Sequence, residues 1–324
     1  MDTFSLVKDK KKKYVMSIGK FIKYYGTEDQ CWEHLYTLRF GENSQIVCSR
    51  CGATSFYFLK TRHLAQCTSC GHQVSPIVGT IMEKSKISLQ NWFYTIYIMT
   101  IGKRGISAME LQYHLGVTYK TAWYLLLRIR TAMAAANDKY ILEGTVVMDE
   151  AFFTGKSALE EGEKLKRGRG TNKTKVLIAV SGTSNGIPQY VRMKIMPNFR
   201  AKTIEGFCTQ YIKRGSTLVT DGFRAYQSQK VTKDYFHEFE VLDSADKKSK
   251  LKQMHHVISN AKAFILGTFH GLANIELQSY LDEYSYRFNR RNMKHLMFDK
   301  LLISILATPP VLYYGHEEEA ELKG

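Results

Sequence analysis

Four cysteines in two CxxC pairs are the first candidates for chemistry: Cys48, Cys51, Cys67 and Cys70. Fifteen residues separate the two pairs. Each CxxC places two thiolates at one tight turn, and two such turns complete a tetrahedron of sulfur ligands. The spacing predicts a zinc ribbon with structural Zn²⁺, because four thiolates leave no coordination position for a substrate. The alternative is a chance cluster of reduced cysteines. Cys31 and Cys208 stand outside the pattern and are expected to be buried thiols.

Two aspartates follow apolar segments. Asp149 ends the run over residues 145–148, and Asp221 comes directly after residues 216–220. Carboxylates delivered from strand ends to one sheet edge can share divalent cations, and Mg²⁺ prefers oxygen ligands. Two-metal phosphoryl transfer needs that arrangement, since one ion activates the attacking hydroxyl and the other stabilises the leaving oxygen. Taken singly, an aspartate after a strand also serves as a turn or helix-capping residue.

A third ligand is expected from a later helix, where His255 and Asn260 compete for the role. Neutral imidazole ligates divalent metals, although it suits Mn²⁺ better than Mg²⁺. The amide oxygen of Asn260 can ligate Mg²⁺ or bind substrate, and a histidine beside His256 can equally be a surface residue. Lys262 lies seven positions after His255, two helical turns along the same face.

The segments that must position the aspartates have a β pattern. Strands are expected at residues 145–149, 176–180 and 190–196, followed by a helix at 202–212 and a fourth strand at 216–220. This order predicts an RNase-H-like α/β domain with a mixed sheet flanked by helices. From His255 onward the chain is expected to be helical, with apolar residues at i, i+3, i+4 and i+7: Leu277, Tyr280, Leu281 and Tyr284.

The amino-terminal half has helical signals around the ribbon. A short helix is expected at residues 28–40 after the N-cap Thr27, and another at residues 88–100. A helix from Ser107, a turn at Gly116 and a second helix match a helix-turn-helix, whose second helix lies in the major groove. That helix carries two candidate DNA contacts, Lys120 and Arg128. The alternative is an ordinary core helix pair joined by glycine.

Composition narrows the class of protein. The chain has 324 residues, 44% of them hydrophobic, which predicts a folded protein of two or three domains. Lysine and arginine outnumber acids 46 to 30, and this balance favours a polyanionic partner, DNA or RNA first. The longest apolar stretch, residues 92–101, is too short to span a bilayer, and no secretory signal precedes it. A cytoplasmic protein is expected, which favours metal over disulfides.

Two basic regions are further candidates for DNA contact. The glycine-rich segment 155–175 suits either a phosphate backbone or a merely solvated loop, and its candidate contacts are Lys166, Arg167 and Arg169. Arg287, Arg290 and Arg291 can bind DNA backbone or, alternatively, stabilise their own domain through caps and ion pairs.

Taken in order, these motifs resemble the bacterial insertion-sequence transposases of the ISXO-type group, which are related to the eukaryotic Merlin transposons. The resemblance covers residues 28–291. Its motifs are the two CxxC pairs, Val147-Met148-Asp149-Glu150 followed by Gly155-Lys156, Thr220-Asp221-Gly222-Phe223-x-x-Tyr226, Ile258-Ser259-Asn260-Ala261-Lys262 with Gly267-x-x-His270-Gly271, and the run over residues 277–291.

The resemblance implies a DDE-type nuclease that cuts transposon ends and joins their 3′-hydroxyls to target DNA by transesterification. By position, Asp149 and Asp221 are similar to the first two acidic residues of the triad. His255 matches the third position, where the superfamily most often has Glu, so this copy resembles a triad without its third carboxylate. Lys262 resembles the basic residue seven places later. Glu150 is expected to face away from Asp149, because strand side chains alternate.

These observations predict the following organisation: a helical segment at 1–45, the zinc ribbon at 46–84, the helix-turn-helix region at 85–140, the RNase-H-like domain at 141–300 and a tail at 301–324. The leading hypothesis is a transposase that binds terminal inverted repeats and catalyses Mg²⁺- or Mn²⁺-dependent cleavage and strand transfer. It would act on double-stranded transposon ends and target DNA as a homo-oligomer at the bacterial nucleoid, with no membrane partner. The alternatives are a catalytically inactive DNA-binding regulator and a nuclease without strand transfer.

Overall fold

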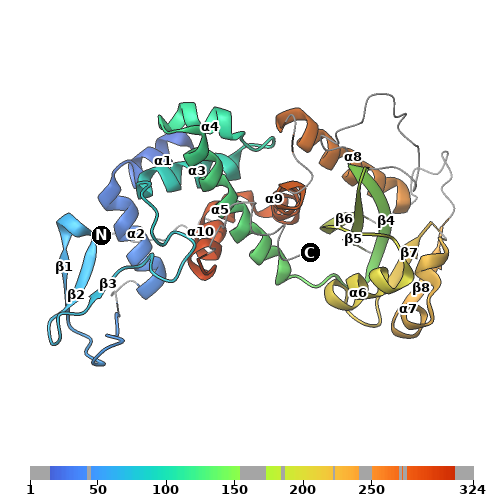
Figure 1. Cartoon of the computed structure of the whole chain (residues 1–324), viewed down its shortest axis with the longest axis horizontal. Coiled ribbons are helices and arrows are strands. Elements are labelled where there is room, and N and C mark those ends of the chain that lie inside the picture. The colour runs from blue at the N-terminus through green and yellow to red at the C-terminus, as the bar shows by residue number, and fades with distance from the viewer. Residues whose placement is uncertain are drawn as a thin grey trace, which may run out of the picture. The chain divides into compact units, whose positions relative to one another are not determined.

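The computed structural model describes residues 15–41, 45–153, 173–183, 187–221, 223–240, 250–269, 272 and 276–310 (Figure 1). The chain divides into two compact units, each described by itself below. The ribbon unit comprises Met1–Ile101, Leu111–Ala132 and Lys294–Gly324, and the sheet unit comprises Gly102–Glu110 and Met133–Met293.

The sheet unit contains a five-stranded mixed sheet with the order β6-β5-β4-β7-β8. Its strands are β4 (Thr145–Phe153), β5 (Thr174–Gly182), β6 (Pro188–Ile195), β7 (Thr217–Thr220) and β8 (Phe236–Phe239). β4, β5 and β6 pair antiparallel, whereas β7 and β8 run parallel to β4. Helix α6 (Ala201–Tyr211) connects β6 to β7. The predicted order of three strands, a helix and a strand is confirmed, and with it the RNase-H-like α/β fold.

Asp149 was expected to end its strand, and this is wrong. β4 continues to Phe153, because Glu150–Phe153 pairs with the first residues of β5 from Leu177 back to Thr174. The apolar run on which the expectation rested does end at Asp149, but the strand is held by its partner rather than by its own hydrophobicity. Asp149 therefore lies inside the sheet.

Two apolar layers cover the sheet. On one face Val147, Ala151 and Phe153 pack against α8 (Lys250–Thr268) and α9 (Leu277–Asn289), and Figure 1 shows α8 beside β4. On the other face Val146 and Met148 pack against α6 and residues near α7 (Gln229–Asp234). This alternation follows from the two-residue period of a strand and places Asp149 on the α8 face. The predicted apolar stripe of α9 packs into the first layer.

The ribbon unit combines helices with a three-stranded antiparallel sheet. Its sheet consists of β1 (Phe56–Leu59), β2 (Leu64–Cys67) and β3 (Gln73–Val74). Its helices include α1 (Ile18–Tyr25), α2 (Glu28–Phe40), α3 (Leu89–Ile101) and α10 (Met297–Ala307). Thr27 caps α2 in a reciprocal capping box with Gln30, so the predicted helix start is confirmed. Phe21 stacks on Tyr97 at 4.5 Å between ring centroids, which joins α1 to α3.

The predicted helix pair is present as α4 (Ala108–Leu115) and α5 (Tyr119–Asp138). Ser107 Oγ accepts a hydrogen bond from Glu110 N at 3.1 Å, and Thr118 Oγ1 accepts one from Thr121 N at 3.3 Å. Between the helices Gly116 adopts φ +64°, a left-handed conformation that favours glycine. Among the described residues, no helix combines the length and apolar character needed to cross a membrane.

Candidate active site and metal centre

Asp149 and His255 meet between β4 and α8. Asp149 Oδ2 lies 3.0 Å from His255 Nε2, and Asp149 Oδ1 accepts a hydrogen bond from Glu150 N at 2.8 Å. The Asp149 side chain is 17% exposed, and that of His255 is 44% exposed. Burial raises the pKa of Asp149, and the charge of Asp221 adds to that rise, while the Glu150 amide and His255 oppose it. The site thus concentrates negative charge at the edge of an apolar layer.

Asp221 stands on an exposed turn one residue beyond β7. Its Oδ1 accepts a hydrogen bond from Phe223 N at 3.1 Å, which closes an Asx turn. Its negative charge raises the pKa of Asp149, so the two carboxylates interact electrostatically. Among the described residues, only the four cysteines gather three or more metal-ligating atoms, so Asp221 approaches the Asp149–His255 pair without completing a shared ligand set.

The structure separates the two candidates for the third position. His255 contacts Asp149, whereas Asn260 is exposed. Five residues rotate a helix by about 140° beyond one full turn, so Asn260 points away from the face that carries His255. Lys262 returns to that face and lies with Nζ 5.8 Å from the centroid of the Phe153 ring. His255 and Lys262 therefore flank β4 at Asp149 and at Phe153.

The Asp149–His255 pair fits a divalent cation. Two ligands at about 2.1 Å from an ion on adjacent octahedral vertices are about 3.0 Å apart. The Asp149 oxygen and the His255 nitrogen have this separation, 3.0 Å. The pair can hold Mg²⁺ or Mn²⁺, and a nitrogen ligand favours Mn²⁺.

The four cysteines converge as the sequence predicts. Their sulfur atoms all lie within 4.8 Å of one another, with Cys48 to Cys70 and Cys51 to Cys67 each at 3.6 Å. Thiolates at about 2.3 Å from a tetrahedral Zn²⁺ are about 3.8 Å apart, so the cluster has the size of a zinc site.

The two CxxC turns of this cluster share one geometry. Gly52 N donates to Cys48 O at 2.8 Å, and Gly71 N donates to Cys67 O at 3.0 Å. Each glycine has a positive φ, +72° and +71°. A left-handed residue after the second cysteine lets both sulfurs of a pair face one ion, and glycine adopts that conformation without strain.

The two unpaired cysteines are buried thiols, as predicted. Cys31 and Cys208 are both 0% exposed. Burial raises the pKa of each to about 12, so both remain protonated.

The predicted DNA contacts differ in accessibility. Lys120 is exposed on the first turn of α5, while the Arg128 guanidinium lies 4.6 Å from the centroid of the Tyr124 ring. Lys166, Arg167 and Arg169 lie outside the described residues.

The arginines at the end of α9 take part in the packing of the sheet unit. Arg290 is 4% exposed, lies 3.7 Å from the Tyr286 ring centroid and donates to Asn137 Oδ1 at 3.3 Å. Arg291 donates to Gln189 O at 2.9 Å. These contacts support the alternative in which the arginines stabilise their own domain.

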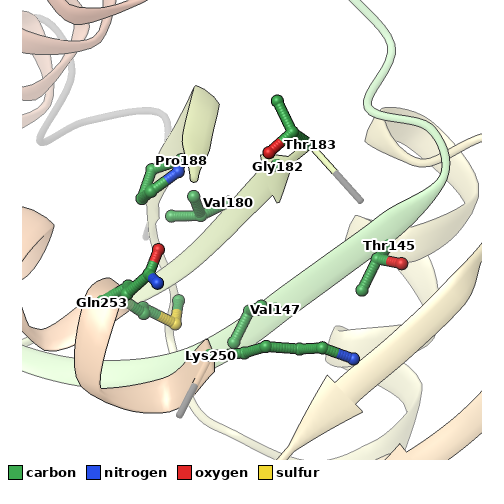
Figure 2. A pocket seen from close by; sticks show the side chains of 9 residues that line it. Thr145, Val147, Val180, Gly182, Thr183, Pro188, Lys250 and Gln253 are labelled. Carbon is green, nitrogen blue, oxygen red and sulfur yellow. The ribbon is translucent and has the colours of Figure 1, made fainter. Parts of the chain in front are cut away.

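A small hollow opens beside the start of α8 but contains none of the candidate catalytic residues. Its lining comes from β4, β5, β6 and α8: Thr145, Val147, Val180, Gly182, Thr183, Pro188, Lys250, Gln253 and Met254. Figure 2 shows Lys250 extending alongside Val147, while Gln253 from the same helix points toward Pro188. The lining is mostly apolar and uncharged, which makes it a continuation of the core beside the site.

Two residues near the site were given no role by the sequence. Tyr226 belongs to the motif after Asp221, and the alternation of strand side chains predicts that Glu150 faces away from Asp149. The structure places Tyr226 in the apolar layer opposite α8, where the charges of Glu150, Asp149 and Asp221 all act on it. The fixed spacing from Asp221 to Tyr226 was the only signal of this placement.

Comparisons with known proteins agree with the motifs. Residues 141–289 match the family model of the ISXO2-like transposase domain, and residues 26–73 match that of the transposase zinc-ribbon domain. A protein of the transposable element ISH50 from Halobacterium salinarum is 28% identical over 56% of this chain. The match spans 63% of that relative, less than two thirds of its length.

Solved structures of low similarity include a catalytic core domain of BIV integrase. That structure has a TM-score of 0.30 and 16% identity, over 44% of this chain and 82% of its own. A pre-cleavage Mos1 transpososome has a TM-score of 0.29 and 13% identity, over 64% of this chain and 76% of its own. The two family matches, in the predicted order, confirm the resemblance: residues 26–73 are similar to a transposase zinc-ribbon domain and residues 141–289 are similar to an ISXO2-like transposase domain.

Proposed function

We propose that this protein is a DNA transposase that binds transposon ends and carries out metal-dependent strand cleavage and strand transfer. The observation that carries the proposal is the contact between Asp149 and His255, with Asp221 nearby, inside a transposase domain. These residues come from three separate elements: β4, α8 and the turn after β7.

The catalytic residues act on a phosphodiester. Asp149, Asp221 and His255 would hold Mg²⁺ or Mn²⁺, which lowers the charge barrier to attack and stabilises the leaving oxygen. In cleavage, a water oxygen forms the new bond to phosphorus while the bond to the 3′-oxygen breaks. In strand transfer, that 3′-hydroxyl attacks a phosphodiester of the target and displaces its 3′-oxygen. Lys262, two helical turns beyond His255, would bind a strand phosphate.

DNA is the partner that the charge distribution supports. The chain carries a formal net charge of +16, and Lys120 stands exposed where a recognition helix begins. We assign terminal-repeat recognition to the zinc ribbon together with α4 and α5, with Lys120 and Arg128 facing DNA. Pairing two transposon ends requires at least two copies of the chain, so a homo-oligomer acting at the nucleoid belongs to the proposal.

The test is cleavage and joining of a DNA duplex that ends in the inverted repeats flanking the reading frame. Wild type should release a nicked or cut end and a joined product with Mg²⁺ or Mn²⁺, and Asp149→Ala and Asp221→Ala should give neither. Asp234→Ala is the matched control, since Asp234 is the last residue of α7 and pairs with Arg214 (3.6 Å).

Each other result has a defined meaning. Cleavage that persists in both Asp149→Ala and Asp221→Ala would refute the site. A wild type that binds its repeats and never cuts would identify a DNA-binding regulator. Cutting without a joined product would identify a nuclease that lacks strand transfer.

A further inference from the structure

The small sheet of the zinc ribbon is packed on one face only. Phe56, Ala65 and Val74 lie on the packed face and join a core with Tyr36 and Ile46. Helix α2, which carries Tyr36, covers this face, and Figure 1 shows α2 beside β1, β2 and β3. Strand side chains alternate, so the residues between the packed ones point to the opposite, outer face.

Three polar side chains form one row across the outer face. Tyr57 on β1 pairs with Gln66 on β2, and Gln66 pairs with Gln73 on β3. Tyr57 is 46% exposed, Gln73 is exposed and Gln66 is half-buried. The row crosses all three strands, so it presents a flat polar surface rather than an isolated side chain.

The two glutamines are joined to each other. Gln73 Nε2 donates a hydrogen bond to Gln66 Oε1 at 2.9 Å. The bond leaves the Gln66 amide nitrogen as a donor and the Gln73 amide oxygen as an acceptor. An adenine presents the complementary groups side by side in the major groove of DNA, the N7 acceptor and the N6 amino donor.

The turn next to this face is positively charged. Lys60 and Arg62 are both exposed in the 3₁₀ turn Lys60–Arg62, which connects β1 to β2. The whole segment 45–82 contains no Asp or Glu. The negatively charged thiolates lie toward the other end of the hairpin, where Cys67 pairs with Phe56. The turn therefore complements a polyanion such as a phosphate backbone.

The hairpin is held rigidly against α2. His63, which follows the turn with φ +49°, stacks on Trp32 at 5.0 Å between ring centroids and 4° between planes. His63 Nδ1 lies 3.7 Å from Asp29 Oδ1. Tyr36 Oη donates to His63 O and to Val74 O, each at 3.1 Å. A surface fixed in this way loses little conformational entropy when it binds a partner.

We propose that the outer face of the zinc ribbon reads base pairs in the major groove of the transposon end. Gln66 donates to N7 and Gln73 accepts from the N6 amino group of one adenine, while Lys60 and Arg62 bind flanking phosphates. The groove admits a two-stranded ribbon, which matches β2 and β3. The inference rests on the proposed binding of transposon ends and names the surface that selects their sequence.

The first experiment measures binding of the zinc-loaded full-length chain to two DNA duplexes by fluorescence anisotropy. One duplex carries the terminal inverted repeat, and the other has the same composition in scrambled order. Gln66→Ala and Gln73→Ala should each weaken binding of the repeat about tenfold, the usual effect of losing a base contact, and leave binding of the scrambled duplex unchanged. Gln189→Ala is the matched control, since Gln189 is an exposed glutamine on β6.

The second experiment changes the DNA instead of the protein. Each adenine of the repeat is replaced in turn by 7-deazaadenine, which keeps its base pairing but lacks the N7 acceptor. At one position the wild type should lose about tenfold in affinity, and Gln66→Ala should lose nothing further, because both changes remove the same contact. Equal losses in the wild type and Gln66→Ala at every position would overturn the inference.

The cations of the turn should behave differently from the glutamines. Lys60→Ala and Arg62→Ala should weaken binding of both duplexes severalfold and lower the slope of log affinity against log salt by about 1 each. All these variants should keep their zinc. If Gln66→Ala loses zinc, Gln73→Ala and the 7-deazaadenine series in the wild type decide the matter.

Other results would also overturn the inference. Wild-type affinity for both glutamine variants would do so, as would equal losses on the repeat and the scrambled duplex. Equal affinity of the wild type for an RNA duplex of the same sequence would exclude major-groove reading, because the major groove of A-form RNA is too narrow for side chains to read.

The outcomes distinguish this inference from the proposed function. A wild type that selects its repeat through Gln66 and Gln73 but never cuts would refute the transposase activity and leave the reading surface standing. A wild type that cuts and joins while both glutamine variants bind normally would refute the reading surface alone. A wild type that binds the repeat no better than the scrambled duplex would refute both.

Discussion

The zinc site and the candidate active site are built in opposite ways. The cysteines lie within one short segment, and sulfurs 22 positions apart in the sequence, those of Cys48 and Cys70, already stand 3.6 Å apart. Asp149 and His255 are 106 positions apart and meet only because β4 and α8 pack in the same layer. The first site depends on two local turns, and the second depends on a whole sheet.

This difference predicts how each site responds to loss of a ligand. The zinc ribbon has a small core, Tyr36, Ile46 and Ala65 with their neighbours, so the metal must supply much of its folding free energy. The sheet unit has two apolar layers of its own, so its site residues are free to serve chemistry. Substitutions in the zinc ribbon should therefore unfold it, and substitutions in the active site should lower the catalytic activity.

Loss of zinc is the largest expected effect. Structural Zn²⁺ contributes about 10–16 kcal/mol in zinc-finger peptides, so Cys67→Ser should abolish zinc binding and unfold the ribbon. Metal content by mass spectrometry should fall to zero, and binding of the repeats should be lost. Cys208→Ala is the control, since Cys208 is buried like Cys67 but lies outside the cluster. Full zinc content in Cys67→Ser would show that the four-thiolate assignment is wrong.

Replacement of Asp149 should separate activity from stability. Asp149→Asn should lower the rate of end cleavage by about 10³ or more, which corresponds to about 4 kcal/mol of transition-state stabilisation. The free energy of unfolding should change by less than about 1 kcal/mol, because burial already disfavours the ionised carboxylate. Urea denaturation measures this second quantity. A large loss of stability would mean that Asp149 holds the sheet together, as the cysteines hold the ribbon.

The same contrast decides what the sequence can predict. The convergence of the four cysteines, the N-cap at Thr27 and the order of the strands follow from local spacing, and the structure confirms them. The length of β4 could not be predicted, because the pairing of its last residues with β5 decides it.

Which of the two candidates for the third position contacts Asp149 also depends on the fold. His255 and Asn260 are both plausible ligands by residue type, and only the direction of α8 relative to β4 shows which one reaches Asp149. The burial of Arg290 could not be predicted from the sequence either, because its partner Asn137 is distant along the chain. Residue type predicts chemistry, whereas accessibility is a property of packing.

Asp282 tests whether burial alone makes a carboxylate functional. It is 4% exposed, and burial raises its pKa to about 6, against which Lys194 and Gln278 act only in part. The native state then binds a proton more tightly than the unfolded state, so stability should fall as the pH rises from about 4 to about 6. The shift corresponds to about 3 kcal/mol at neutral pH.

Asp282→Asn should remove this loss and flatten the stability profile over that pH range, without changing end cleavage. Urea denaturation at pH 4.5 and pH 8 measures the first effect. A strong loss of cleavage in Asp282→Asn would show that a second buried carboxylate belongs to the active site, and would weaken the distinction between structural and catalytic acids in the sheet unit.

Lys120 is an exposed cation and Arg290 is a buried one. Substitutions of these two residues should have the smallest effects on the affinity for DNA. Lys120→Ala should weaken binding of the repeats severalfold and lower the slope of log affinity against log salt by about 1, because one phosphate contact is lost. Arg290→Met should leave that slope unchanged and instead lower the free energy of unfolding by about 2–4 kcal/mol, since Asn137 loses a buried partner. Fluorescence anisotropy at several salt concentrations measures the slopes. A reduced slope in Arg290→Met would mean that Arg290 leaves its place over Tyr286 to meet DNA.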